Sequence, residues 1–284
     1  MIGVFDSGAG GLSVFREIYR LLPEEKYLFF SDNAYCPYGD KSPDFIQKRC
    51  FAITDFLLGK GADIIVVACN TATGAAINSL RDNYKVKFIG MEPAVKPAAL
   101  STHTGVIGVM ATAGTLSGTK YLINKGKYGE NVNIVESVGK GWVELVESGN
   151  WKGEEAEKIV KESLQPLLDA GADNIVLGCT HYPFLSGIIR KLIGPDIKLI
   201  DPAPAAARHL IYVMVQEGLL DERRATGVLA KAAGLCDLAT TKDDISLKAS
   251  EPDIELYTSG NPSALSRVFS EIFSANTEVI SINI

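Results

Sequence analysis

Leu57-Leu58-Gly59-Lys60-Gly61-Ala62-Asp63-Ile64-Ile65-Val66-Val67-Ala68-Cys69 matches a second stretch of the same chain, Leu-Leu-Asp-Ala-Gly-Ala-Asp-Asn-Ile-Val-Leu-Gly-Cys at residues 167–179. Eight of the 13 positions are identical, at a constant offset of 110. Residues 9–13 also match residues 113–117, at an offset of 104. A helix followed by Gly-Ala-Asp and a strand is a common pattern of α/β proteins, but two ordered matches favour a pair of similar domains. Each domain would place a cysteine at the carboxyl end of a strand.

Short apolar segments alternate with helical patterns along the chain, which predicts βαβ units and mainly parallel sheets with helices on both faces. The run Ile64–Ala68 is continuously apolar, as expected of a strand that is buried on both sides. Helices are expected after Gly10-Gly11 and from Ser42-Pro43, a serine N-cap followed by proline. The expected strands are Ile2–Phe5, Tyr27–Phe30, Ile64–Ala68, Val86–Ile89, Val106–Met110, Val132–Glu136, Ile175–Gly178 and Ile197–Ile200.

Prolines cluster after strands near Met91–Pro97 and Asp201–Ala205, and we expect the chain to cross between domains at these two places. A chain that crosses twice returns to its first domain. The prediction is therefore a discontinuous first domain, residues 1–94 and 206–284, and a second domain, residues 95–205. Residues 223–252 are polar and weakly periodic, and no structure is assigned to them.

The composition excludes several classes of protein. The chain has 284 residues, 46% of them hydrophobic, and 28 Lys+Arg against 34 Asp+Glu give a net charge of −6. With a pI near 5.2, no nucleic-acid partner is expected. No apolar run approaches the roughly 18 residues of a membrane span, and no signal peptide is visible at the N-terminus. Five cysteines without a C-x-x-C pair favour a reducing, cytoplasmic location.

Cys69 and Cys179 differ from the other cysteines because polar residues follow each of them, Asn70-Thr71 and Thr180-His181. A helix that starts after each strand would lower the pKa of the thiol through backbone N–H groups and the helix dipole. A thiolate and a thiol on opposite faces of one carbon form a base and an acid, and together they can invert a stereocentre without a cofactor. For Cys36, Cys50 and Cys236 a structural role is expected.

Three other functional interpretations explain these residues less well. The glycine-rich segment Gly8–Ser13 follows a strand, but its third glycine position is Ser13 and Asp6 would repel a pyrophosphate, which argues against NAD. A zinc site on Cys179 and His181 lacks spaced ligand pairs, so no metal is expected. A cysteine-dependent hydrolase with a Cys179–His181 pair stays open as an alternative. It leaves Cys69 unexplained.

Four segments together resemble the signature segments of bacterial glutamate racemases, within the aspartate/glutamate racemase family, in that family's order and spacing. They are Phe5–Val14, Pro37-Tyr38-Gly39, Ala68–Thr73 and Gly178–Pro183. The resemblance implies two α/β domains related by pseudo-twofold symmetry, with the active site in the cleft between them. It implies a cofactor-independent enzyme that interconverts L- and D-glutamate for peptidoglycan synthesis, and a homodimer is expected. A racemase of another acidic amino acid is the second alternative.

The resemblance also assigns roles to residues of this chain. Cys69 would deprotonate D-glutamate and Cys179 L-glutamate, with Asp6 and His181 assisting the two thiols. The substrate-binding residues that it implies are Asp6, Ser7, Tyr38, Gly39, Asn70, Thr71, Thr180 and His181. The chain departs from the family at residues 31–35, Ser-Asp-Asn-Ala-Tyr in place of Gly-Asp-Thr-Ala-Arg, and in the segment after residue 137, which lacks a Cys-Pro start but keeps an acidic residue at Glu147.

Overall fold

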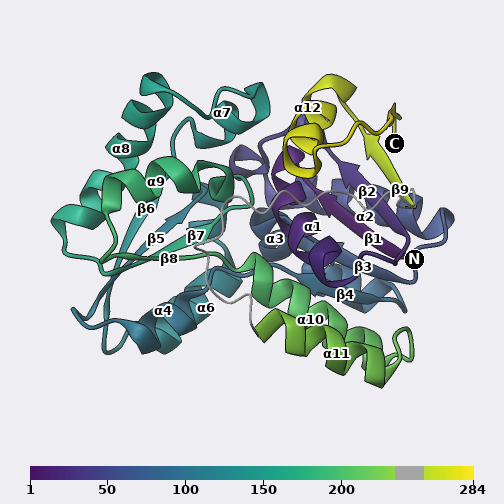
Figure 1. Cartoon of the computed structure of the whole chain (residues 1–284), viewed down its shortest axis with the longest axis horizontal. Helices are drawn as coiled ribbons and strands as arrows, with labels where there is room; N and C mark the ends of the chain where they lie inside the picture. The colour runs from purple at the N-terminus through teal and green to yellow at the C-terminus, as the bar shows by residue number, and fades with distance from the viewer. Residues whose placement is uncertain (234–252) are drawn as a thin grey trace.

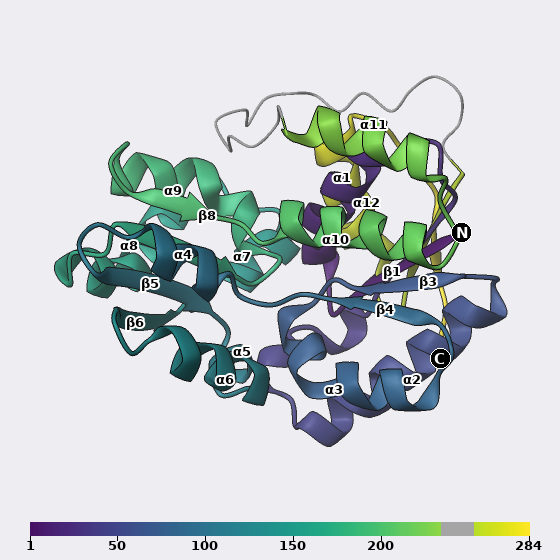
Figure 2. The same cartoon turned by 90° about the horizontal axis from the view of Figure 1, so that it is seen from below.

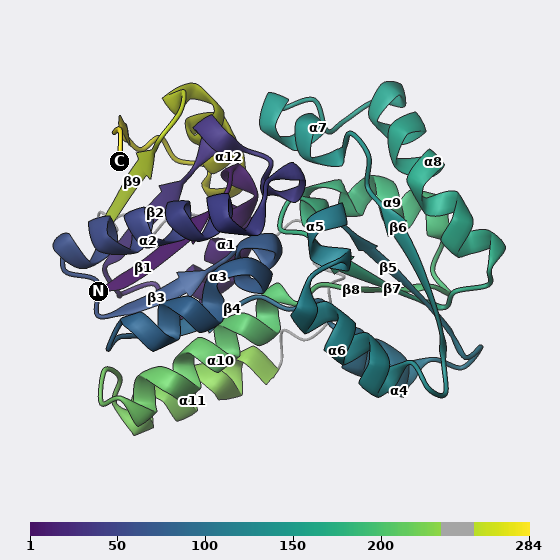
Figure 3. The ribbon, with the colours of Figure 1, turned by 180° about the vertical axis from the view of Figure 1, so that it is seen from behind.

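The computed structural model describes residues 1–233 and 253–284 as two α/β lobes that lie side by side (Figure 1). Each lobe is built on one parallel sheet with helices on both faces (Figures 2 and 3). The expected fold class, two parallel-sheet α/β domains, is therefore confirmed. Cys236 lies outside the described residues. Among the helices of those residues, none is long and apolar enough to cross a membrane.

The first sheet has six parallel strands in the order β10-β9-β2-β1-β3-β4. Its central strands are mostly apolar and fully buried, because successive residues alternate between two helical layers. Phe5 and Val67 pack in one core, and Val4 and Val66 pack in the other. The strands are β1 Ile2–Asp6, β2 Tyr27–Ser31, β3 Ile64–Val67, β4 Lys87–Gly90, β9 Ile254–Thr258 and β10 Val279–Ser281.

The second sheet repeats part of this topology. Its order, β6-β5-β7-β8, corresponds to β2-β1-β3-β4 of the first sheet. The correspondence pairs β3 with β7, the two strands that precede Cys69 and Cys179, as the sequence repeat predicts. The strands are β5 Val106–Ala111, β6 Asn133–Val138, β7 Asn174–Gly178 and β8 Lys198–Ile200.

Helices cover both faces of each sheet. In the first lobe α2 and α3 lie on one face of the sheet, and α1, α10, α11 and α12 lie on the other side (Figure 2). These helices are α1 Leu12–Leu21, α2 Pro43–Gly59, α3 Asn70–Asn83, α10 Ala203–Gln216, α11 Glu222–Ala233 and α12 Pro262–Phe273. The second lobe has α4 Val95–Ser101, α5 Ala113–Leu116, α6 Thr119–Tyr128, α7 Trp142–Ser148, α8 Glu154–Asp169 and α9 Ser186–Ile193. Short 3-10 turns are η1 Ala9–Gly11, η2 Asn33–Tyr35, η3 Tyr38–Asp40 and η4 Tyr182–Leu185.

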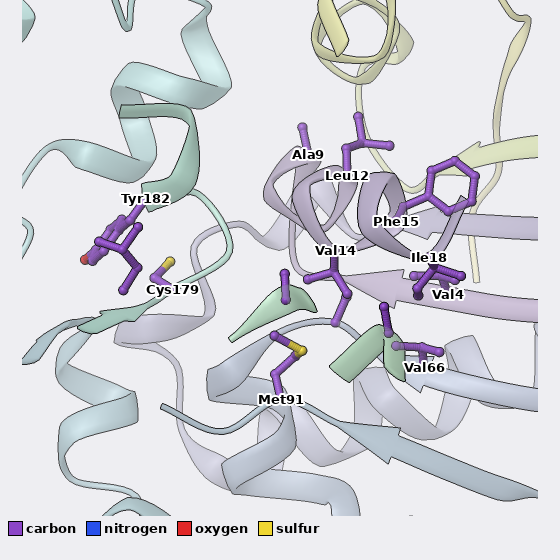
Figure 4. Packing of buried hydrophobic residues seen from close by; sticks show 14 of the residues in the cluster. Val4, Ala9, Leu12, Val14, Phe15, Ile18, Val66, Met91, Cys179 and Tyr182 are labelled. Atoms are coloured by element: carbon purple, nitrogen blue, oxygen red, sulfur yellow. The ribbon is translucent and has the colours of Figure 1, made fainter. Parts of the chain in front are cut away.

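One buried apolar cluster extends through both lobes. It includes Leu12 and Phe15 of α1 and also Cys179 and Tyr182 of the second lobe (Figure 4). Burial of such side chains contributes about 25 cal/mol per Å² of apolar surface. The shared core therefore links the two sheets at the level of their carboxyl ends, where the site lies.

All eight expected strands are present, with ends shifted by one or two residues. The helix start at Ser42-Pro43 is confirmed, because the Ser42 side chain accepts a hydrogen bond from the Phe45 N–H. The unassigned region 223–252 contains most of α11, and residues 234–252 lie outside the described part. β9 and β10 were not identified from the sequence.

The chain leaves the first sheet after Gly90, enters the second lobe with α4 at Val95, and leaves the second sheet after Ile200. On the basis of these crossings we propose a second domain of residues 95–205 and a first domain of residues 1–94 and 206–284.

Candidate active site

A cavity of about 10 Å³ lies between the two lobes, at the carboxyl ends of β1, β3 and β7. A space of this size holds roughly one water molecule. Both cysteines line it, Cys69 from the first sheet and Cys179 from the second. The residues around it are Ser7, Pro37, Tyr38, Gly39, Cys69, Asn70, Thr71, Thr112, Val143, Cys179, Thr180 and His181. Nine of the ten residues that the sequence predicts for the site are among them, and the tenth, Asp6, lies directly behind Ser7.

Cys69 is the N-cap of α3, and its sulfur accepts a hydrogen bond from the Ala72 N–H at 3.4 Å. The Ser7 hydroxyl lies 3.6 Å from the same sulfur. Burial raises the pKa of the Cys69 thiol well above its usual value, and the nearby Asp6 carboxylate raises it further, whereas the Ala72 and Ser7 contacts lower it. The helix start thus lowers the pKa of Cys69 as expected, but the net shift in the closed cleft is upward. Desolvation outweighs the single N–H contact.

Asp6 ends β1 and is fully buried. One carboxylate oxygen accepts hydrogen bonds from the N–H and the hydroxyl of Ser7, at 2.6 and 3.2 Å. The other accepts one from the Thr180 hydroxyl at 2.8 Å. Burial raises the pKa of Asp6, although the charge of His181 and these hydrogen bonds act in the opposite direction. Asp6 is thus a proton-binding group beside the Cys69 thiol.

Cys179 has a different neighbour. The turn after β7 places His181 Nδ1 at 3.7 Å from the Cys179 sulfur. On the other side of the ring, Nε2 lies 2.6 Å from an oxygen of Glu147, which is on α7. Burial alone would lower the pKa of His181, but its hydrogen bonds to Cys179, Cys36 and Glu147 outweigh burial and raise that pKa well above its usual value. The imidazole lies between a thiol and a carboxylate, and these contacts favour its protonated form.

Glu147 joins the second lobe to the first. Besides His181, it accepts hydrogen bonds from the Ala9 N–H at 2.7 Å and from the Asn33 amide at 2.6 Å. Burial raises the pKa of Glu147, but His181 and these donors more than compensate and lower it overall. The close approach requires glycine at Gly8, because a Cβ there would lie 2.2 Å from a Glu147 oxygen.

A cluster of threonine hydroxyls joins the lobes at another part of the cavity wall. Thr71, on α3, lies 2.9 Å from the Thr112 hydroxyl and 3.1 Å from that of Thr115. Gly39 packs on Thr112, whose Cβ would lie 3.0 Å from any side chain added at that glycine. These contacts and those of Glu147 hold the cleft in a closed arrangement.

Asn70 has an unpaired amide group at the cavity wall. Its side chain is buried at the cavity wall, and neither its amide nitrogen nor its oxygen has a hydrogen-bond partner. Leaving such groups unpaired costs about 1–3 kcal/mol, which a polar substrate could recover. Tyr38 differs from this, because its hydroxyl bonds to Asp32, away from the cleft. Tyr38 therefore presents its buried ring to the cavity while its hydroxyl is already engaged.

Pro37, Thr112 and Val143 line the cavity but were not predicted from the sequence as site residues. A signal for Thr112 existed, since it follows the expected strand Val106–Met110 and directly precedes the repeated segment 113–117. Glu147 was noted as an acidic position, but no local pattern indicated its contacts with the first lobe. Among residues 1–233 and 253–284, the side chains of Cys36, Glu147 and His181 also lie close enough together to hold a metal ion.

Comparisons with known proteins show the family and the fold. A family model described as Asp/Glu/Hydantoin racemase matches residues 2–210. The glutamate racemase of Methylococcus capsulatus is 46% identical over 80% of this chain and 84% of its own length, and that of Stutzerimonas stutzeri is 45% identical over 79% and 86%. The crystal structure of a glutamate racemase isoform from Bacillus anthracis is similar, with a TM-score of 0.81, 28% identity, and coverage of 100% of this chain and 97% of that one. A Francisella tularensis glutamate racemase solved with D-glutamate has a TM-score of 0.77, 27% identity, and the same coverage.

Proposed function

The chain belongs to the Asp/Glu/hydantoin racemase family, and on this premise we propose that it interconverts L- and D-glutamate by proton transfer at Cα between two cysteines. One observation carries the proposal: Cys69 and Cys179 come from different sheets and line the same cavity. Relatives named glutamate racemase, 43–46% identical to this chain, support glutamate as the substrate.

The reaction needs one sulfur as thiolate and the other as thiol. Cys69 as thiolate removes the Cα proton of D-glutamate and becomes a thiol. The Cys179 thiol then gives its proton to the opposite face of the carbanion, which yields L-glutamate. The reverse direction exchanges the two roles, so no proton is gained or lost over the cycle. General acid–base catalysis of this kind contributes roughly 10²–10⁴-fold in rate.

A different ionisable residue lies beside each sulfur, and each can bring its sulfur to the protonation state that the reaction needs. Beside Cys69, the buried Asp6 carboxylate is suited to accept the thiol proton, because burial raises its pKa above the ordinary value of an aspartate. Beside Cys179, the protonated His181 stabilises a thiolate by its positive charge or returns a proton to it. Each direction of the reaction therefore depends on its own assisting residue.

Polar groups at the cavity wall would hold the substrate. Asn70 offers an unpaired amide, and Ser7, Thr71 and Thr180 offer hydroxyls at the same strand ends. Backbone at Gly39 completes the wall. Since the closed cavity holds about one water molecule, glutamate has to enter while the lobes are apart and is then enclosed.

Three further assignments belong to the same proposal. D-Glutamate from this reaction would serve peptidoglycan synthesis, as the resemblance implies. A cytoplasmic location fits the reduced state of Cys36, Cys50, Cys69 and Cys179, which are free thiols. A homodimer is proposed as the assembly, to be checked by light scattering.

The test is incubation with L-glutamate in deuterated water, followed by circular dichroism and by the NMR signal of the Cα proton. We expect the optical signal to decay to zero while deuterium enters Cα, with no added cofactor and equally in the presence of a chelator. L-Aspartate serves as the parallel substrate. Faster exchange of aspartate would assign the chain to another acidic amino acid, and hydrolysis of an amide without Cα exchange would favour the cysteine-dependent hydrolase.

A further inference from the structure

Three side chains with different metal-binding atoms meet beside the cavity: Cys36, Glu147 and His181. Their ligand atoms all lie within 4.8 Å of one another. We infer that these three residues form an inhibitory site for a thiophilic divalent cation such as Zn²⁺, which ties the two lobes together. The inhibition rests on the proposed racemase function, whereas binding of the ion does not.

The donor set is one that zinc prefers. Zn²⁺ binds thiolate sulfur at about 2.3 Å and imidazole nitrogen or carboxylate oxygen at about 2.0–2.2 Å, usually in a tetrahedron. The Cys36 sulfur lies 3.8 Å from Glu147 Oε1, close to the spacing that these bond lengths give. His181 Nε2 lies 2.6 Å from the same oxygen, so this pair has to widen by a fraction of an ångström. A water molecule would take the fourth position.

The other nitrogen of His181 faces Cys179, so Nε2 is the atom available to the ion. Binding replaces the proton on the Cys36 sulfur and the proton on Nε2. Both protons go to the buffer, and no group is oxidised or reduced. Cys36 is half-buried and the Glu147 side chain is 18% exposed, whereas His181 is buried.

The three ligands come from both lobes. Cys36 follows η2 in the first lobe, whereas Glu147 is on α7 and His181 follows β7 in the second. A bound ion would therefore cross-link the lobes in the closed arrangement. Because the closed cavity is far too small for an amino acid, an enzyme held in this state cannot admit substrate. Binding would also break the hydrogen bond between His181 and Glu147.

Cobalt(II) is the probe for the site, because a thiolate ligand to Co²⁺ gives a charge-transfer band in the near ultraviolet. The reduced, chelator-treated full-length chain is titrated with CoCl₂. We expect one equivalent to bind with this band, and ZnCl₂ to displace it. Cys36→Ala and Cys36→Ser should both lose the band and bind Co²⁺ at least ten-fold more weakly, with unchanged far-ultraviolet circular dichroism. Cys50→Ala, which removes a buried thiol from α2, is the matched control and should keep the band.

The double variant Cys69→Ala/Cys179→Ala separates this site from the catalytic pair, and it should also keep the band. In activity assays, ZnCl₂ should inhibit the wild-type chain, chelator should restore it, and Cys36→Ala should need at least ten-fold more Zn²⁺ for the same fractional inhibition of its own metal-free rate. A band that survives in Cys36→Ala, or that disappears in the double variant, would overturn the proposal. If the chain showed no racemase activity, the cobalt spectra would still test metal binding on their own.

Discussion

The Thr180 hydroxyl of one lobe donates a 2.8 Å hydrogen bond to the buried Asp6 carboxylate of the other. Thr180 follows Cys179 directly, and the second oxygen of Asp6 accepts from Ser7, whose hydroxyl contacts Cys69. One carboxylate thus connects the surroundings of both sulfurs. Burial of this charged group lowers the stability of the folded protein, because a carboxylate in a site with little water is stabilised by only a few hydrogen bonds.

Asp6→Asn is expected to stabilise the protein at neutral pH while it lowers activity. The folded pKa of Asp6 lies above its ordinary value of 3.8. The free energy of unfolding therefore decreases as the pH rises from below 3.8 through the raised pKa of Asp6 in the folded protein. Above that pKa the full cost of burying the charged carboxylate applies. Removing the charge should raise Tm by a few degrees near pH 8, about what 1 kcal/mol gives in a protein of this size.

The advantage of Asp6→Asn should shrink as the pH is lowered toward 4, which thermal melts across that range would show. Racemisation should fall by roughly 10²–10⁴-fold if Asp6 accepts a proton from Cys69. A variant less stable than wild type at pH 8 would contradict the argument from burial.

Glu147→Gln is expected to destabilise the protein most in mildly acidic solution. The raised pKa of His181 means that its stabilising contacts are fully present below its ordinary value of 6.5 and are lost as pH rises through the folded value. The lowered pKa of Glu147 means that its own contribution is lost as pH falls below about 4.5. The difference from wild type should thus be largest between about pH 5 and 6.5.

We expect that difference to be about 1.5–3 kcal/mol in urea denaturation near pH 6, the usual contribution of a hydrogen bond to a charged group. It should narrow in alkaline solution. Glu130→Gln, at an exposed position after α6, is the control and should change stability by less than about 0.5 kcal/mol. An equal loss for Glu147→Gln at pH 6 and in alkaline solution would mean that the ionic contact with His181 is not its source.

The parts of the fold that could be predicted are those with local signals. β3 and β7 are continuous apolar runs, and the repeat that contains them indicates two similar sheets. β10 has no such signal, because Val279–Ser281 is three residues long and mostly exposed. α11 has only two large apolar residues, Val228 and Leu229, and a glycine between them and its charged first turn, so no helix was assigned there from the sequence.

The site residues also divide into those with a local sequence signal and those without one. Cys69 could be predicted because it lies just after β3, and positions at the carboxyl ends of strands meet at one edge of a parallel sheet. Asn70 and Thr71, in the first turn of α3, were predicted as binding residues only through the resemblance to the family. The contacts of Glu147 with Ala9 and Asn33 could not be predicted, since they depend on how two lobes pack. The raised pKa of the Cys69 thiol was missed for a related reason. Burial in the closed cleft is a tertiary effect that the helix start alone does not reveal.

Gly10→Ala should disturb His181 without straining the backbone. A Cβ at this position would lie 2.4 Å from His181 Nδ1, the atom that faces Cys179. Because Gly10 does not have a positive φ, alanine fits the backbone, and the clash must move the imidazole. We expect racemisation to fall by about 10–100-fold, with a loss of about 1–3 kcal/mol in stability from overpacking. Gly74→Ala, in α3 with open space around it, should keep full activity and gain up to about 1 kcal/mol. Equal activities of these two variants would contradict a role for the position of His181.

Replacing either catalytic cysteine by serine should lower racemisation by orders of magnitude, since a serine hydroxyl is a far weaker base than a thiolate. The two variants should nevertheless differ, because Asp6 assists Cys69 whereas His181 assists Cys179. Cys69→Ser keeps the sulfur assigned to L-glutamate and should still exchange the Cα proton of that enantiomer in deuterated water. Cys179→Ser should exchange only that of D-glutamate. NMR of each enantiomer incubated separately measures this difference, with Cys50→Ala as the control for a lost buried thiol. Near-normal turnover by Cys179→Ser in both directions, or the same residual exchange of both enantiomers by both variants, would exclude two cysteines acting from opposite faces of one carbon.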